Sequence, residues 1–359
     1  MSIGPWYFSR TGMIRRVAIA LVVLALTTAG APALALRGTP VPDAAAETAG
    51  LSRAEPVPLG EAVIAGPAEL RVLDVLIGPE AVAAILAASP HNLEPRDGAT
   101  YVAVNLAARN AGGAPLWLDN DDFALTGDSG LVQRFLGVQP PEPALNVTLE
   151  PGEAASGWIA FAAGASEGSL LLLFDSLELG GTWADRVLAL QEGARIPDLP
   201  TRVAAPNDAG ADPSTPLGPG EVAVTDQWSV ELIDVVTGAS AFDIVDYRTG
   251  ALGVGDASGE DGSVWVALRF RIQNAQAGGG AATFPANAFV LVDEAGTPLL
   301  DIATLTPPWP DAAGDYYPGA VREGWVMFDV PWEYRAATVR FLPNPQTATE
   351  LDPRYFTYG

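Results

Sequence analysis

The sequence predicts an all-β protein made of two tandem β-sandwich domains joined by a proline-rich linker. Short stretches alternate apolar with polar residues, the period of a half-buried strand, and turn residues separate them. Four blocks of residues recur in the same order in the two halves of the chain. Only one short stretch, Glu80 to Ala88, has helical character. Many short strands with almost no helix are typical of a sandwich.

The composition excludes several classes of function. The 359 residues carry 19 basic and 43 acidic side chains, and the net charge of −24 opposes binding to nucleic acid or anionic lipid. There is no Cys, every basic residue is Arg, and His91 is the one histidine. Thiol chemistry, lysine Schiff bases and metal sites built on several imidazoles are therefore excluded. Because 49% of the residues are hydrophobic, the chain has enough apolar surface for a core.

Residues 1–35 have the pattern of a secretory signal peptide. Arg15 and Arg16 precede an apolar run from Val17 to Leu26, and Ala33-Leu34-Ala35 has the small residues of a cleavage site. We therefore expect a secreted or cell-envelope protein. If the segment stays uncleaved it would anchor the chain, and this is the one membrane contact that the sequence predicts.

Two proline-rich segments divide the remaining chain. Residues 36–58 and 194–219 are rich in Ala and Pro and lack apolar periodicity, which is typical of extended linkers. They leave a first domain at residues 59–193 and a second at residues 220–359, both of ordinary domain size.

The two domains align with one another along their length. The offset between matching residues grows slowly in one direction, as loop insertions after a duplication would produce. The matched residues include Leu70, Val72, Asp74 and Val75 with Val230, Leu232, Asp234 and Val235; Asn110 with Asn274; Phe123 and Leu125 with Phe289 and Leu291; and Pro151, Gly152, Gly157 and Trp158 with Pro318, Gly319, Gly324 and Trp325.

Each copy is predicted to hold the same strands in the same order. The second strand of each copy ends at an asparagine and a glycine-containing turn, the third leads into a tight hairpin turn, and a Pro-Gly turn precedes the fourth. The predicted strands are 70–75, 101–106, 123–125, 157–161 and 170–174 in the first copy, and 230–235, 265–270, 289–291, 324–328 and 338–342 in the second.

These motifs also resemble a known family. An Asp-Val step, a Tyr-Val-x-Val strand ending in Asn, Phe-x-Leu before Asp-x-Gly, and Pro-Gly before Gly-Trp-x-x-Phe resemble the telokin-like, immunoglobulin-type sandwich domains of secreted bacterial proteins. That family has no known function and is related in fold to the mycobacterial immunoprotective extracellular antigen. The resemblance covers Gly60 to Phe174 and Gly220 to Leu342. It implies an immunoglobulin-like fold, export and work at the cell surface, and it brings no catalytic residues.

An acidic loop is a candidate calcium site. Asp119, Asp121 and Asp122 offer several carboxylates within one turn, and calcium prefers such oxygen ligands. The spacing does not fit an EF-hand, and the matching positions of the second copy lack the acids. The alternative is a solvated turn in which Asp and Asn cap backbone amides. No other cofactor is expected.

An aromatic, proline-rich loop is a candidate ligand site. Trp309 lies between prolines, and Tyr316 and Tyr317 precede Pro318. Exposed rings of this kind can stack on a sugar ring or hold a proline-rich peptide. The alternative is that they cover the end of the sandwich or pack on the other domain.

Together these features predict an exported, non-catalytic module that binds, adheres or acts as a spacer at the bacterial cell envelope. Its partner would be an extracellular protein or polysaccharide. Two alternatives stay open, namely an extracellular hydrolase that cleaves a glycan through carboxylates, and a calcium-dependent adhesion protein. No paired-acid motif or activated nucleophile singles out a catalytic residue.

Overall fold

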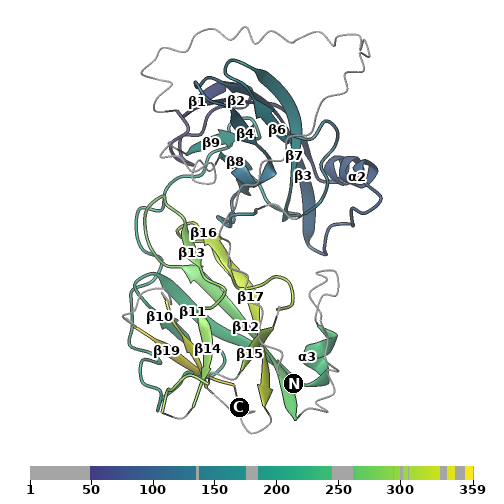
Figure 1. Ribbon diagram of the computed structural model, residues 1–359. Coiled ribbons are helices and arrows are strands. Elements are labelled where there is room, and N and C mark those ends of the chain that lie inside the picture. The colour runs from purple at the N-terminus through teal and green to yellow at the C-terminus, as the bar shows by residue number, and fades with distance from the viewer. Residues whose placement is uncertain are drawn as a thin grey trace. The chain divides into compact units, whose positions relative to one another are not determined.

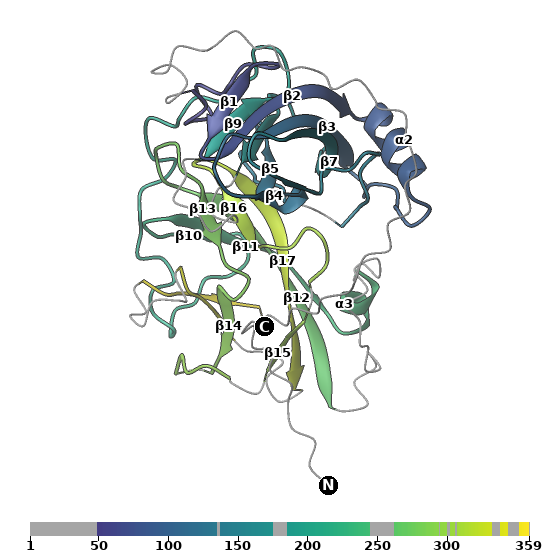
Figure 2. The ribbon, with the colours of Figure 1, turned by 45° about the horizontal axis from the view of Figure 1, so that its top comes forward.

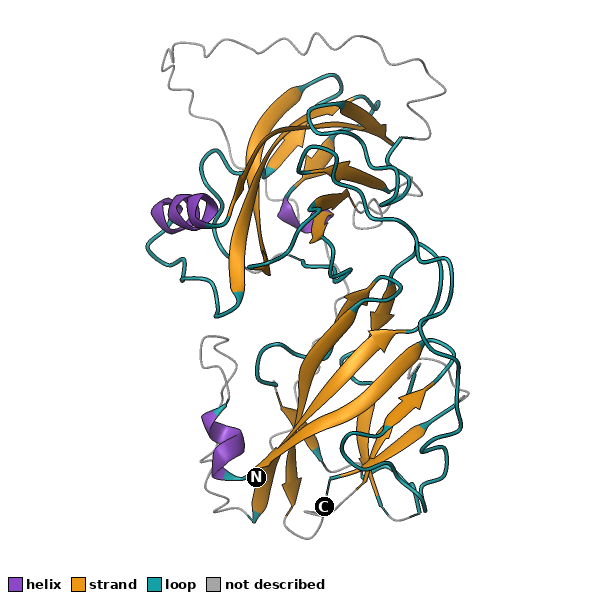
Figure 3. Cartoon of the chain, turned by 180° about the vertical axis from the view of Figure 1, so that it is seen from behind, coloured by secondary structure: helices purple, strands orange, loops and turns teal. Residues whose placement is uncertain are grey.

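The computed structural model describes residues 49–134, 137–174, 185–244, 262–293, 295–299, 302–305, 307–331, 338–343 and 352–358. The predicted signal peptide and most of the first predicted linker lie outside these residues. Strands dominate the described chain, and α-helices are few and short (Figure 3). Both predicted domains belong to one compact unit, Val41–Gly359. The predicted fold class, two tandem β-sandwiches, is confirmed.

The first sandwich is built from three antiparallel sheets (Figure 1), with strand orders β1-β2-β3-β7, β5-β8-β9 and β4-β6. Its elements are β1 (Ala62–Ala65), β2 (Ala68–Ile77), α2 (Pro79–Ala88), β3 (Ala99–Asn110), β4 (Leu116–Leu118), the 3-10 turn η1 (Asn120–Asp122), β5 (Phe123–Thr126), β6 (Val147–Leu149), β7 (Ala154–Gly164), β8 (Leu171–Phe174) and β9 (Arg186–Ala189).

The second sandwich repeats this topology with one added strand, β15, and its strand orders are β10-β11-β12-β17-β15, β14-β18-β19 and β13-β16. Its elements are β10 (Val222–Val224), β11 (Trp228–Thr237), α3 (Ala239–Asp243), β12 (Ser263–Asn274), β13 (Ala282–Phe284), β14 (Phe289–Val292), β15 (Ala303–Leu305), β16 (Gly314–Tyr316), β17 (Val321–Pro331), β18 (Thr338–Phe341) and β19 (Arg354–Thr357).

The matched aspartates have the same structural task in both copies. The pairing of β2 with β3 shifts between Val72 and Asp74, and that of β11 with β12 shifts between Leu232 and Asp234. At each bulge the carboxylate of the aspartate accepts a hydrogen bond from the next backbone N–H, at 2.9 Å in the first copy and 2.8 Å in the second. A β-bulge is a specific feature of a strand, so its repetition supports duplication.

The matched asparagines join two sheets in each copy. Asn110 Nδ2 donates to the Leu149 carbonyl in β6, and Asn274 Nδ2 donates to the Tyr316 carbonyl in β16, both at 2.8 Å. The backbone carbonyl of each asparagine also accepts from the glycine of the Pro-Gly turn, Gly152 or Gly319. Both glycines have a φ of +84°, which other residues rarely adopt. The matched residues therefore form the same hydrogen bonds between sheets in both halves, and we call this set of bonds the asparagine clamp.

The two cores differ in their chemistry. The first is mainly aliphatic, with one tilted ring pair, Phe123 and Phe174. The second is a cluster of rings in which Trp228, Phe284 and Tyr316 meet edge to face or tilted. Burial of these apolar side chains supplies the main stabilising term for both sandwiches.

A helix packs on the outer face of one sheet in each copy (Figures 1 and 2). In the first, Ala81 and Ile85 of α2 lie against Tyr101 of β3. In the second, Ala241 of α3 lies against Trp265 of β12. The sequence predicted α2 but not α3, because five residues are too few for a visible helical period.

Both predicted linkers extend too far into the folded protein. Val57, within the predicted linker 36–58, is buried in the first core and exchanges backbone hydrogen bonds with β9. Leu217, within the predicted linker 194–219, is buried in the second core and pairs with β19. The sequence showed no strand period there because each contact involves a single bridging residue.

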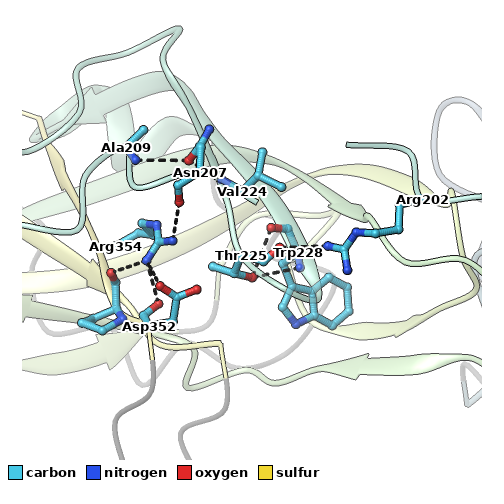
Figure 4. A network of polar contacts seen from close by, with 9 residues as sticks. Arg202, Asn207, Ala209, Val224, Thr225, Trp228, Asp352 and Arg354 are labelled. Atoms are coloured by element: carbon cyan, nitrogen blue, oxygen red, sulfur yellow. Dashed lines mark hydrogen bonds and ion pairs between the residues drawn. The ribbon is translucent and has the colours of Figure 1, made fainter. Parts of the chain in front are cut away.

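A polar network fastens the second of these segments to its sandwich (Figure 4). Arg354 of β19 is 1% exposed, and its Nη2 donates to the Asn207 carbonyl at 2.6 Å. Asn207 Oδ1 in turn accepts from the backbone N–H of Val224 in β10 at 3.1 Å. The sequence also missed β9 and β19 themselves, since it ended each copy one strand earlier.

Candidate functional site

Backbone hydrogen bonds to strand β17 hold the segment that follows Trp309. The Pro310 carbonyl accepts from Trp325 N–H of β17 at 2.9 Å, and Ala312 N–H donates to the Trp325 carbonyl at 3.1 Å. Gly324 permits this approach, because a Cβ there would lie 2.4 Å from the Asp311 carbonyl oxygen. The Trp309 side chain is 44% exposed. A backbone fastened to a strand thus presents a large aromatic ring to solvent.

Trp309 lines a cleft of about 630 Å³ to which both sandwiches contribute. The Arg96 guanidinium lies 5.2 Å from the Trp309 ring centroid. This distance is within the range of a cation–π contact. A concave surface with one aromatic ring and a few charged groups is the usual form of a small-ligand site. The charged residues that line it are Arg96, Arg134, Glu167, Asp311, Asp315, Arg322 and Glu323.

The acidic groups of the cleft are held by defined partners. Asp315 accepts from Arg134 Nη2 at 3.3 Å and from Thr283 Oγ1 at 2.6 Å. Asp311 lies 3.7 Å from Arg322 Nη1. Desolvation raises the pKa of Asp311 above its ordinary value, and the nearby guanidinium groups of Arg322 and Arg96 oppose that rise. Asp315 is therefore held by two side chains, whereas the Asp311 side chain is 56% exposed.

Tyr316 and Tyr317, the other two predicted ligand-binding residues, are buried, whereas Trp309 is exposed. Tyr316 is fully buried in the second core, and its hydroxyl donates to the Ala312 carbonyl at 2.7 Å. Tyr317 is 8% exposed, and its ring lies 3.5 Å from the Arg53 guanidinium carbon. Burial raises the pKa of both phenols. Of the three predicted aromatic residues, Trp309 alone presents an open ring, so a three-ring platform does not form.

Backbone hydrogen bonds between the two sandwiches border the cleft. Tyr317 N–H donates to the Gly130 carbonyl at 2.9 Å, and Val132 N–H donates to the Asp315 carbonyl at 3.0 Å. Gly130 is suited to this contact because a Cβ at its position would lie 3.1 Å from the Ala320 Cβ. The backbone on either side of Tyr316 therefore joins the two sandwiches.

The acidic loop at residues 119–122 forms a capping box around η1. Asp119 Oδ1 accepts from Asp121 N–H, and Asp122 Oδ2 accepts from Asp119 N–H, both at 2.9 Å. Asp119 Oδ2 also accepts from Trp117 Nε1 at 3.1 Å. Within the described residues, no group of three or more acidic or imidazole side chains is placed to hold a metal ion. The geometry is that of a self-capped turn.

This geometry gives a prediction for Asp119. Replacing it with alanine should lower the free energy of unfolding by about 1 kcal/mol, because the turn loses its cap. The melting temperature of the wild-type chain should be the same in calcium and in chelator. Thermal denaturation of both proteins under both conditions checks this, and a rise in melting temperature with calcium that Asp119→Ala removes would instead establish the calcium site.

The sequence did not reveal the arginines of the cleft. Arg96, Arg134 and Arg322 lie in segments without a shared motif, and the fold alone brings them to Trp309. Of these three, Arg96 lies over the Trp309 ring, Arg134 pairs with Asp315, and Arg322 lies over the Tyr316 ring.

Comparisons with known proteins give one family match, and it covers the first sandwich. Residues 57–185 match the model of a domain of unknown function, DUF4352. A search of curated proteins gives no match to this chain. Among the described residues, none of the helices is long and apolar enough to span a membrane.

Solved structures that align with part of this chain come from several bacteria. The ycdA protein of Bacillus subtilis aligns at 13% identity and a TM-score of 0.28, over 38% of this chain and 38% of its own. This chain therefore matches well under half of that protein. The yjhA protein of B. subtilis aligns at 13% identity and a TM-score of 0.27, over 37% of this chain and 98% of its own. The secreted protein MPT63 of Mycobacterium tuberculosis aligns at 12% identity and a TM-score of 0.27, over 37% and 97%.

Proposed function

We propose that this chain, whose residues 57–185 match the model of a domain of unknown function, is an exported, non-catalytic binding protein that holds a polysaccharide of the bacterial cell envelope against Trp309. The observation that carries the proposal is the exposed Trp309 ring in a cleft of about 630 Å³ lined by charged groups. An aromatic face buries the apolar face of a sugar ring, and surrounding charged groups accept or donate hydrogen bonds to its hydroxyls.

Export is part of the same proposal. The N-terminal 35 residues have the pattern of a secretory signal, and the absence of Cys is compatible with a chain stabilised by its cores alone. The net charge of −24 supports solubility and disfavours nucleic acid as a partner.

The test uses a panel of envelope oligosaccharides and the chain from Leu36 onward, coupled through a terminal tag because it has no lysine. Trp309→Ala should weaken binding about tenfold or more, since central aromatic contacts contribute the most binding energy. Trp309→Phe should retain part of it. Trp117→Ala is the matched control, because Trp117 is 52% exposed in the first sandwich and does not line the cleft. Equal binding by wild type and Trp309→Ala would contradict the proposal.

The same oligosaccharides and protein also distinguish a binding protein from a hydrolase. Asp311 is the cleft carboxyl whose pKa is raised, which is a property of many general acids. We expect the bound oligosaccharide to be recovered intact after prolonged incubation. If the oligosaccharide is cleaved, and Asp311→Asn abolishes cleavage but retains binding, the chain is a carboxylate hydrolase and the proposal of a non-catalytic protein is wrong.

A further inference from the structure

A second cavity adjoins the Trp309 cleft and contains an unusual arginine. The cavity has a volume of about 540 Å³ and shares Val132, Arg134 and Asp315 with the cleft. The cleft and the cavity therefore adjoin at the ion pair between Arg134 and Asp315. The charged residues that line the cavity are Arg53, Arg134, Arg186, Asp185, Asp198 and Asp315.

Arg53 is a buried arginine of the cavity whose guanidinium lies on an aromatic ring. Arg134 forms an ion pair with Asp315, and Arg186 Nη1 donates to the Asp185 carbonyl at 3.0 Å. Arg53 is 4% exposed, its guanidinium carbon lies 3.5 Å from the centroid of the Tyr317 ring, and its Nε has no hydrogen-bond partner within the described residues. Leaving a buried donor without a partner is costly.

Stacking on Tyr317 suits the arginine for one type of ligand. A guanidinium that lies on an aromatic ring keeps its planar edge of N–H donors available, and this edge matches the two oxygens of a carboxylate. Desolvation lowers the pKa of Arg53, and the nearby Tyr317 and Asp198 oppose that lowering. A bound anion would favour the charged form further.

The other charges favour a carboxylate over a phosphate. Three aspartates also line the cavity, so a dianion would meet more repulsion than a single negative charge. The net charge of the whole chain repels anions only weakly at this site, because physiological salt screens exposed charges beyond about 8 Å.

We infer that a carboxylate of an acidic saccharide binds Arg53 in this cavity while a sugar ring of the same saccharide lies on Trp309. This inference rests on the proposed function and adds the class of polysaccharide, one that contains uronic acids. It assigns Arg53 as a specificity residue that distinguishes an acidic sugar from a neutral one.

The experiment compares two probes, trigalacturonic acid and its methyl ester, which differ in their carboxylates. Isothermal titration calorimetry of the wild-type chain should show the acid binding about tenfold more tightly than the ester, as expected for a charge-assisted pair of hydrogen bonds. Arg53→Met should bring the acid to the level of the ester and leave the ester unchanged. Arg53→Lys should fall between them, because an ammonium keeps the charge without the planar edge.

The matched control is Arg109→Met, which removes one positive charge from an ion pair with Glu69 outside both spaces. It should bind both probes like wild type. Thermal denaturation and near-ultraviolet circular dichroism of each variant separate lost binding from lost folding.

Each contrary result has a distinct meaning. If the ester binds through Trp309 and the acid has no advantage, the inference fails and the proposed function stands. If Arg53→Met weakens both probes equally, Arg53 has a structural role and the inference fails. If inorganic phosphate competes with the acid more strongly than acetate does, the cavity prefers phosphate and the inference fails. If neither probe nor any other saccharide binds, the proposed function fails as well.

Discussion

Gly324→Ala is expected to lower the free energy of unfolding by about 3 kcal/mol and to abolish binding at Trp309. A Cβ at Gly324 would lie 2.4 Å from the Asp311 carbonyl oxygen and 2.6 Å from the Ala312 Cα. These are backbone atoms of the segment that holds Trp309, so they cannot rotate away as a flexible side chain would. The segment must leave β17, and the hydrogen bonds between Trp325 and its neighbours are lost. Urea denaturation measures the stability, and calorimetry with the oligosaccharide measures the binding.

Gly157→Ala is the control for this prediction. Gly157 is the matching residue of the first copy, and its Cβ would lie 2.6 Å from the Leu145 backbone nitrogen. We expect a similar loss of stability, because the local geometry is the same. Binding should survive in the fraction that remains folded, since Trp309 belongs to the second copy. A Gly324→Ala chain that is as stable as wild type would show that residues 310–312 do not lie as close to β17 as described.

Asn110→Ala and Asn274→Ala are each expected to lower the free energy of unfolding by about 3 kcal/mol. Asn110 Nδ2 donates to the carbonyls of Ala114 and Leu149, and its Oδ1 accepts from Gly112 N–H at 2.9 Å. Alanine leaves all three backbone groups without these bonds in a mostly buried setting. Asn274→Ala removes the equivalent bonds to the Tyr316 carbonyl and from Gln276 N–H.

Two further variants sharpen this test, with stability measured by denaturant unfolding. Asn110→Asp keeps the acceptor oxygen but loses both donated hydrogen bonds, so it should destabilise as strongly as alanine. Asn146→Ala changes an exposed asparagine and should alter stability by less than about 0.5 kcal/mol. If Asn110→Ala were as mild as Asn146→Ala, the clamp would have no energetic weight in either copy.

The asparagine clamp and the β-bulge show why much of the fold could be predicted from the sequence. Strand periods, Pro-Gly turns and the recurrence of Asp74 and Asn110 at Asp234 and Asn274 are local signals, and each corresponds to a structural element. Elements that depend on distant partners were missed. β9 and β19 are four residues long, and α3 has only five, so they are defined by what they pair with or pack on and not by their own pattern.

The candidate site was likewise predictable only in the part that has a local sequence signal. Trp309 was recognisable from its surroundings of proline, but nothing near it in the sequence indicated which ring of the aromatic loop would be exposed. Tyr316 entered the second core because it lies in β16 facing Trp228, and Tyr317 was covered by Arg53 from the other sandwich. Burial is decided by the neighbours that the fold supplies, and a single segment does not specify them.

The sequence by itself determined the class of fold, its duplication and the side-chain chemistry that the chain lacks, because strand period, turn residues and composition act locally or by simple count. Only the tertiary structure decided that Arg134 meets Asp315 and that Arg53 lies on Tyr317. Those partners are far apart along the chain, and they come together because two sandwiches pack into one compact unit. The cleft and the cavity, which residues of both copies line, therefore depend on how the copies pack.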